Sequence, residues 1–123
     1  MKSGVTGIRR LVNASRYSWQ GLTAAWQSEA AIRQEIIALA ILLPIALILP
    51  VSPVEKALLI FSALLVLVVE LINSALEAVV DRIGSELHEL SGKAKDVGSA
   101  AVLVALVMAG LVWVIILLPL LKR

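Results

Sequence analysis

Three long apolar runs, separated by short polar segments, dominate the pattern of the chain. Each run can be extended to the roughly 20 residues that a helix needs to cross the hydrocarbon core of a bilayer. The runs are Ile36 to Leu49, Ala57 to Ile72 and Val97 to Leu121. We therefore predict an all-α membrane protein whose transmembrane helices cover about 30–49, 54–83 and 94–121.

Prolines and glycines separate the predicted spans. Pro50 and Pro53 follow the first apolar run and predict a tight turn, because proline ends helices. Gly84 and Gly92 enclose a polar connector before the third span. The chain is too short for a second domain, so we predict one membrane domain over residues 1–123.

The segment before the first span, about 5–27, mixes apolar and aromatic residues with basic ones. Trp19 and Trp26 would lie at the depth of the lipid headgroups, where aromatic side chains gather. Such a mixture is typical of an amphipathic helix that lies in the membrane interface. We predict a surface helix here; an anchor that only fixes topology has a similar composition.

Composition restricts the possible functions. Hydrophobic residues make up 60% of the 123 residues, well above the roughly 45–50% of soluble domains, and the mean hydropathy is +0.98. A net charge of +2, without a basic stripe, argues against a nucleic-acid partner. The chain has no cysteine, which excludes disulfides and thiolate chemistry. Any chemistry must come from carboxylates, amines, hydroxyls and the single histidine, His88.

The distribution of basic residues predicts the orientation in the membrane. Eight of the eleven Lys and Arg residues precede the first apolar run or lie between the second and third runs. Cytoplasmic loops carry an excess of basic residues. The N-terminus and the 81–96 connector are therefore predicted to be cytoplasmic.

The second span ends in a polar stripe of Glu70, Asn73, Glu77 and Asp81, called the acidic stripe below. At about 100° per residue, these four positions fall on one helix face. An acidic residue at mid-membrane costs about 2.5–3.5 kcal/mol, so cations are expected to stabilise the stripe. Near the cytoplasmic end, Glu77 suits a metal reachable from water, whereas the deeper Glu70 suits a proton acceptor beside a lipid headgroup.

A second polar cluster spans the connector and the start of the third span. Its cations, carboxylates and helix N-terminus are the groups that hold polyphosphates and metals, although a solvated loop with stop-transfer charges has a similar composition. Its members are Glu86, His88, Glu89, Lys93, Lys95, Asp96 and Ser99. It is not a P-loop, because Leu87 replaces the first glycine and Ala94 replaces the required Ser or Thr.

Four segments match motifs of a known family. They are Tyr17-Ser18-Trp19 with Gly21-Leu22, Glu29 through Glu35, Glu70 through Asp81, and His88 through Asp96. The block Glu-x-x-Asn-Ser-Ala-x-Glu is highly specific. Over nearly its whole length the chain resembles the prokaryotic diacylglycerol kinase family. The resemblance implies a homotrimer in the inner membrane that uses Mg²⁺ and moves the γ-phosphoryl of ATP to diacylglycerol, giving phosphatidic acid.

The resemblance also implies residue roles. Glu70 looks like the catalytic base, Glu29 and Glu77 look like the metal ligands, and Asn73 and Asp81 look like supporting residues. The residues that resemble the nucleotide-contacting set are Arg10, Tyr17, Glu29, Glu77, Glu86, Leu87, His88, Lys95 and Asp96. Those that resemble the lipid-contacting set are Arg10, Ala14, Ser15, Arg16, Tyr17, Ser18, Trp19, Thr23, Ala24, Ala25, Trp26, Ala31, Ile32, Arg33, Gln34, Glu35, Glu70, Ser99 and Trp113.

Two alternatives compete with this interpretation. An undecaprenol kinase of the same family would share the catalytic core, but the connector from His88 to Gly92 favours diacylglycerol. A non-enzymatic transporter or membrane assembly would use Glu70 and Glu77 as relay groups. It would need polar residues along the other spans, whose apolar runs offer only Ser99 and Trp113. The polar chemistry therefore stops in the cytoplasmic half, as an interfacial enzyme requires.

Overall fold

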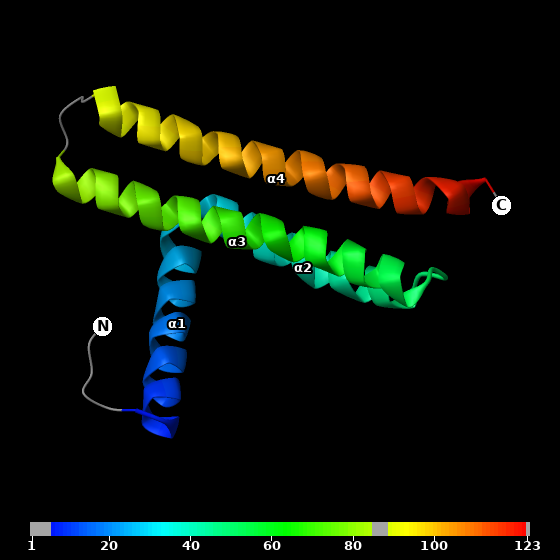
Figure 1. The fold of residues 1–123 in the computed structure, drawn as a ribbon, viewed down its shortest axis with the longest axis horizontal. Coiled ribbons are helices and arrows are strands. Elements are labelled where there is room, and N and C mark those ends of the chain that lie inside the picture. Colours follow the sequence, from blue (N-terminus) through cyan, green and yellow to red (C-terminus); the bar gives the residue numbers. More distant parts are fainter. Residues whose placement is uncertain (1–5, 85–88, 123) are drawn as a thin grey trace.

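The structure, a computed structural model, describes residues 6–84 and 89–122 as helices joined by short turns, which confirms the all-α prediction. α2, α3 and α4 run antiparallel to their neighbours, and α1 lies crosswise to them (Figure 1). The helices are α1 (Ile8–Ser28), α2 (Ala30–Ile48), α3 (Pro53–Ile83) and α4 (Glu89–Leu121).

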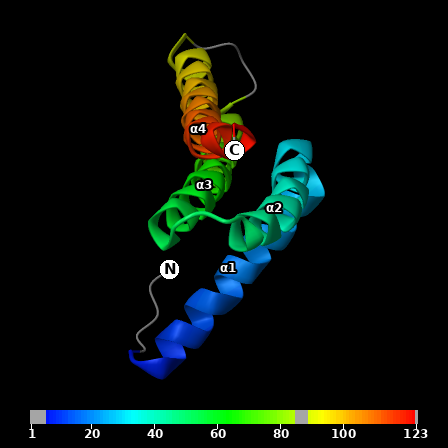
Figure 2. The ribbon, with the colours of Figure 1, turned by 90° about the vertical axis from the view of Figure 1, so that its right-hand side faces the viewer.

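α3 is the central helix and packs against both α2 and α4 (Figure 2). α2, α3 and α4 are each long and apolar enough to cross a membrane, which confirms the three predicted spans. In the described part of the chain, the buried side chains form small clusters, such as Ala46, Leu59 and Ile116 between the spans. Large apolar side chains such as Phe61, 66% exposed, point outward. Lipid or other membrane helices must cover that surface, so the chain is a multi-pass membrane protein.

The turn between α2 and α3 is closed by hydrogen bonds. Ser52 and Glu55 form a capping box: the Glu55 N–H donates to Ser52 Oγ at 3.2 Å, and the Ser52 N–H donates to Glu55 Oε1 at 2.9 Å. Pro53 occupies the first helical position, where its missing N–H costs nothing. Lys56 Nζ donates to the Leu47 carbonyl at 2.7 Å, which satisfies an orphan group of α2. These contacts set the register of α2 against α3.

Near that turn, a side chain of α4 forms a hydrogen bond to one backbone carbonyl of α3. Trp113 Nε1 donates to the Leu59 carbonyl at 3.1 Å, and Ser62 Oγ donates to the same oxygen at 3.1 Å. A polar group inside the apolar bundle must find such a partner. The indole of Trp113, which was predicted to contact lipid, therefore holds two spans together here.

Further along the same pair, Gly98 of α4 lies against Asn73 of α3. A Cβ built on Gly98 would collide with Asn73 Oδ1 and meet the Leu76 side chain at 3.2 Å. Small residues allow membrane helices to approach closely. Asn73 Oδ1 is buried there and has no hydrogen-bond partner among the described residues. Gly98 is therefore required for this close approach of α3 and α4.

α4 begins at Glu89, which corrects the prediction of a helix from about residue 94. Gly92 lies inside α4 instead of ending the connector. A single glycine in a helix costs only about 1 kcal/mol, which the neighbouring residues can offset. The acidic Glu89 in the first turn also complements the positive end of the helix dipole.

α1 meets α2 at a sharp corner formed by Glu29. Its extended backbone, with φ −122° and ψ 110°, ends α1 and begins α2. Arg33 of α2 closes the corner, because its Nη1 donates to the carbonyls of Trp26 at 2.6 Å and Gln27 at 3.2 Å. The guanidinium satisfies the orphan carbonyls at the end of α1 and its charge suits the negative end of the helix dipole. α1 is therefore held where it turns away from the bundle.

Candidate functional site

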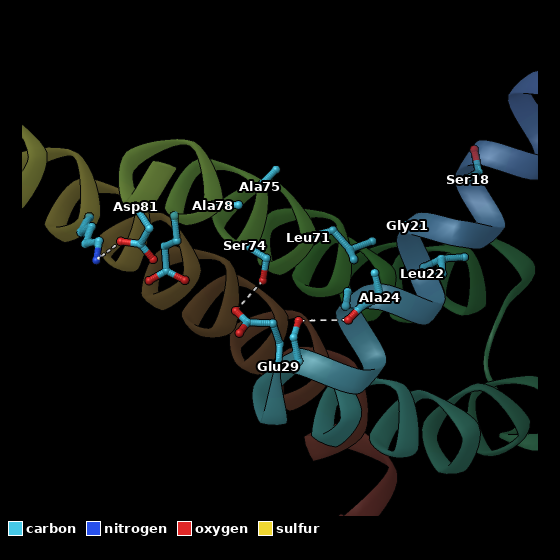
Figure 3. Close-up of a pocket in the computed structure, with 14 residues that line it drawn as sticks. Ser18, Gly21, Leu22, Ala24, Glu29, Leu71, Ser74, Ala75, Ala78 and Asp81 are labelled. Carbon is cyan, nitrogen blue, oxygen red and sulfur yellow. Dashed lines mark hydrogen bonds and ion pairs between the residues drawn. The ribbon is translucent and has the colours of Figure 1, made fainter. Parts of the chain in front are cut away.

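A cavity of about 840 Å³ opens in the angle between α1 and α3. Its wall combines small and apolar residues of α1 and α3 with three carboxylates, two serine hydroxyls of α1, one of α3, and an amine of α4 (Figure 3). The lining residues are Ser18, Gly21, Leu22, Ala24, Ala25, Ser28, Glu29, Leu71, Ser74, Ala75, Glu77, Ala78, Asp81 and Lys95.

Helix lengths explain why the cavity forms at this level. The 19 residues of α2 rise about 28 Å, whereas the 31 residues of α3 rise about 46 Å. Because α2 ends and α3 begins at the same turn, the last helical turns of α3 extend beyond the corner at Glu29. α1 crosses there, and the projecting part of α3 carries Glu77 and Asp81. The acidic stripe therefore reaches past the apolar part of the bundle.

Glu29 and Ser74 connect the helix corner to α3. Ser74 Oγ donates to Glu29 Oε1 at 2.8 Å, and the pair is partly buried (Figure 3). Glu29, predicted as a metal ligand, lies in the cavity wall with Glu77, the other predicted ligand. The structure thus brings the two carboxylates, 48 positions apart in the sequence, to one cavity.

The rim of the cavity carries an ion pair between α3 and α4. Lys95 Nζ lies 2.8 Å from Asp81 Oδ1, and the two side chains are 43% and 65% exposed. Such an exposed pair contributes little to stability. It does hold the Lys95 ammonium, predicted to contact the nucleotide, at the mouth of the cavity.

Acidic side chains gather around the cavity. Glu70 lies one helical turn before Ser74, on the membrane side, near the carboxylates of Glu77 and Glu29. Glu35 of α2 lies near Glu70 in turn. Neighbouring carboxylates repel one another when they are charged, and a bound cation relieves this repulsion. Electrostatics therefore favours a positively charged ligand at this end of the bundle.

The donor set suits Mg²⁺ held jointly with a polyphosphate. Among residues 6–84 and 89–122, no three His, Cys, Asp or Glu side chains are grouped so that the protein alone could hold a metal ion. Mg²⁺ is commonly bound through one or two carboxylates together with substrate phosphates and water. Glu29 and Glu77, both oxygen donors facing the same cavity, match that pattern.

Several predicted residues lie away from the cavity. Arg10 and Tyr17 stand about 28 Å and 18 Å from Glu29 along α1. The Arg16 guanidinium lies 5.7 Å from the ring centre of Tyr17, and its Nη2 donates to Asn13 at 3.3 Å. None of these side chains lines the cavity formed by one chain.

Most of the remaining predicted positions fall into four groups. Ser18, Ala24 and Ala25 line the cavity. Ile32 is fully buried within the chain, and Trp113 lies about 27 Å from Lys95 along α4. The predicted Glu86, Leu87 and His88 lie outside the described residues. The exposed predicted positions on α1, α2 and α4 are Ala14, Ser15, Trp19, Trp26, Ala31, Gln34, Asp96 and Ser99.

Ser74 has a contact that the sequence analysis did not assign. It belongs to the recognised block, but no role was given to it. A count of helical rise would have found its partner: about 20 residues on either side of the turn bring Glu29 level with Ser74. Ser28, Leu71 and Ala78 also line the cavity without having been predicted to do so.

Comparisons with known proteins identify the family of the chain. The family model "Prokaryotic diacylglycerol kinase" matches residues 16–117. A diacylglycerol kinase of Escherichia coli K12 is 55% identical over 95% of this chain and 96% of its own length. Those of Haemophilus influenzae and Pseudomonas aeruginosa are 51% and 50% identical, over 88% and 94% of this chain and 92% and 94% of their own lengths. The chain therefore belongs to the prokaryotic diacylglycerol kinase family.

Proposed function

We propose that this protein is a diacylglycerol kinase that transfers the γ-phosphoryl group of Mg-ATP to the hydroxyl of diacylglycerol. One observation carries the proposal: Glu29 and Glu77 share a cavity with Lys95 at the polar end of the spans. The relatives at 50–55% identity are named diacylglycerol kinases, which supports this lipid over undecaprenol. The carboxylates that line the cavity lie together at one end of the bundle, which also suits an interfacial enzyme better than a transporter.

The chain's own side chains supply the positioning that phosphoryl transfer requires. Glu29 and Glu77 would hold Mg²⁺, which when bound neutralises phosphate charge. Lys95 offers an ammonium to the nucleotide phosphates from the rim. Asn73 and Asp81 support these groups from α3, and Asp81 does so by holding Lys95.

Glu70 is the proposed general base. The hydroxyl oxygen of diacylglycerol forms the new bond to the γ-phosphorus, the bond to the bridging oxygen of ADP breaks, and the hydroxyl proton passes to Glu70. Glu70 lies one turn closer to the apolar part of α3 than Ser74. That depth suits a lipid whose hydroxyl lies at the interface and whose chains stay in the bilayer.

α1 is proposed to lie in the cytoplasmic interface of the inner membrane. It runs crosswise to the spans, and none of its residues is buried in the chain. Apolar side chains such as Ile8, Leu11 and Trp19 are exposed and need an apolar environment. The excess of basic residues on this side supports a cytoplasmic N-terminus.

The protein is proposed to act as a homotrimer, as its family resemblance implies. The spans expose most of their apolar side chains within one chain. Self-association would cover part of that surface through close packing of the helices.

A transfer assay tests the proposal. The protein would be purified in mild detergent and given labelled Mg-ATP with diacylglycerol or undecaprenol, and the lipid product would be measured. We expect labelled phosphatidic acid and its loss in Glu70→Gln. Labelling of undecaprenol alone would show that undecaprenol is the acceptor instead of diacylglycerol. A folded oligomer that labels neither lipid would contradict the kinase assignment.

A further inference from the structure

Ser74 uses its hydroxyl differently from other helical hydroxyls of this chain. Thr23 and Ser28 of α1 donate to carbonyls one turn back in their own helix, and Ser62 does so in α3. This is the usual local bond of a serine or threonine within a helix. Ser74 instead donates across the structure to Glu29, 45 positions away in the sequence. Its proton is therefore used to orient a carboxylate.

The backbone of Glu29 is already fixed where this bond forms. Its N–H donates to the Ala25 carbonyl at 2.9 Å, and its carbonyl accepts from the Arg33 N–H at 3.2 Å. Arg33 in addition binds the end of α1. These backbone bonds leave the side-chain dihedral angles of Glu29 free, and the hydrogen bond from Ser74 fixes them.

One carboxylate oxygen of Glu29 remains available after this bond. A carboxylate has two oxygens with about four acceptor positions, and Ser74 occupies one position on Oε1. In metal sites, groups that hydrogen-bond to a ligand orient it before the metal arrives. Ser74 sits between Glu70 and Glu77 on α3, so it connects Glu29 to the helix that carries both other proposed functional carboxylates.

We propose that Ser74 is a positioning residue for the divalent cation, acting by holding the Glu29 carboxylate toward Glu77. This inference rests on the proposed kinase function and names a residue that acts on that site without touching the cation. Because the bond spans the corner and α3, it also fixes how α1 and α3 enclose the cavity.

Manganese binding tests this role without relying on turnover. Mn²⁺ would be titrated by electron paramagnetic resonance into the purified full-length oligomer with a non-hydrolysable ATP analogue. Loss of a group that orients a metal ligand typically weakens metal affinity about 10- to 100-fold. We expect Ser74→Ala to show that weakening, with a matching rise in the KM for Mg²⁺ and a kcat at saturating metal near that of the unchanged protein.

Two variants separate positioning from a general structural effect. Ser74→Thr keeps the hydroxyl and should restore Mn²⁺ affinity, whereas Ser62→Ala removes a hydroxyl of the same helix that bonds to its own helix and should leave affinity unchanged. Wild-type affinity in a Ser74→Ala protein that melts normally would overturn the positioning role. The proposed function fails independently, if the unchanged protein transfers no phosphoryl group to diacylglycerol.

Discussion

The two ends of the helical bundle use polar residues in opposite ways. At the α2–α3 turn, Ser52, Lys56 and Trp113 each bond to the backbone and close a helix end or a helix pair. At the other end, Glu29 and Glu77 face a cavity, and Glu70 lies near them. The first arrangement satisfies groups of the fold itself, whereas the second leaves charge for a ligand to neutralise. Substitutions at the two ends should therefore affect different measurements.

The largest expected effect is that of Glu77→Gln at the cavity. It removes a charge from the proposed cation site without changing side-chain volume, so transfer to diacylglycerol should fall about 100-fold or more. Insertion and thermal unfolding should not change, because Glu77 closes no helix end. The assay is phosphatidic acid formation across a range of Mg²⁺ concentrations. Full activity in Glu77→Gln would remove this residue from the metal site.

Glu70→Gln should have the next largest effect and should separate chemistry from binding. Removing a general base typically lowers turnover about 10²- to 10⁴-fold. Nucleotide affinity should stay nearly constant, because Glu70 is not part of the cavity wall. Single-turnover transfer and equilibrium binding of a labelled ATP analogue measure the two quantities. An equal loss of both would assign Glu70 to nucleotide binding instead of proton transfer.

The contrast between the ends also shows what the sequence can predict. Apolar run length gives the three spans because the bilayer fixes the length of a spanning helix. The spacing of Glu70, Glu77 and Asp81 gives a shared face because the helical period is fixed. The family was recognised from the Glu-x-x-Asn-Ser-Ala-x-Glu block and is confirmed by the comparisons. These predictions depend on local regularities.

Other features depend on pairings that local patterns do not encode. The direction of α1 follows from one extended residue, Glu29, and from the bonds of Arg33 to α1 carbonyls. The start of α4 was predicted five residues late because Gly92 was taken as a helix boundary. The bond between Ser74 and Glu29 requires the register of two helices, which the α2–α3 turn determines. The roles assigned to the site residues stay predictions until activity is measured.

Between the two ends, a glycine pair in α4 provides a stability test of intermediate size. Gly98→Ala would place a methyl group against Asn73 and Leu76, and such overpacking costs about 1–3 kcal/mol. Gly110→Ala is the matched control, since nothing lies within 4 Å of the added carbon and alanine favours a helix by about 1 kcal/mol. Unfolding in mixed micelles titrated with SDS compares the two free energies.

The free energy of unfolding should fall in Gly98→Ala and rise in Gly110→Ala. Displacement of Asn73 should also lower transfer in Gly98→Ala, because Asn73 belongs to the acidic stripe. Gly110→Ala should retain activity. Equal stability of the two variants would show that α3 and α4 can separate at Gly98 without loss, and the close approach would then have no energetic importance.

The smallest expected effect lies at the α2–α3 turn, in Ser52→Ala. Loss of the serine cap removes the acceptor of the Glu55 N–H and should lower the free energy of unfolding by about 1 kcal/mol. Mn²⁺ affinity and phosphatidic acid formation should both stay at wild-type levels, because the cavity lies about 28 Å away along α2. SDS titration and the transfer assay on one preparation measure both properties. A Ser52→Ala protein with normal stability but weaker metal binding would mean that the turn controls the cavity at a distance, since the register it sets is what brings Glu29 level with Ser74.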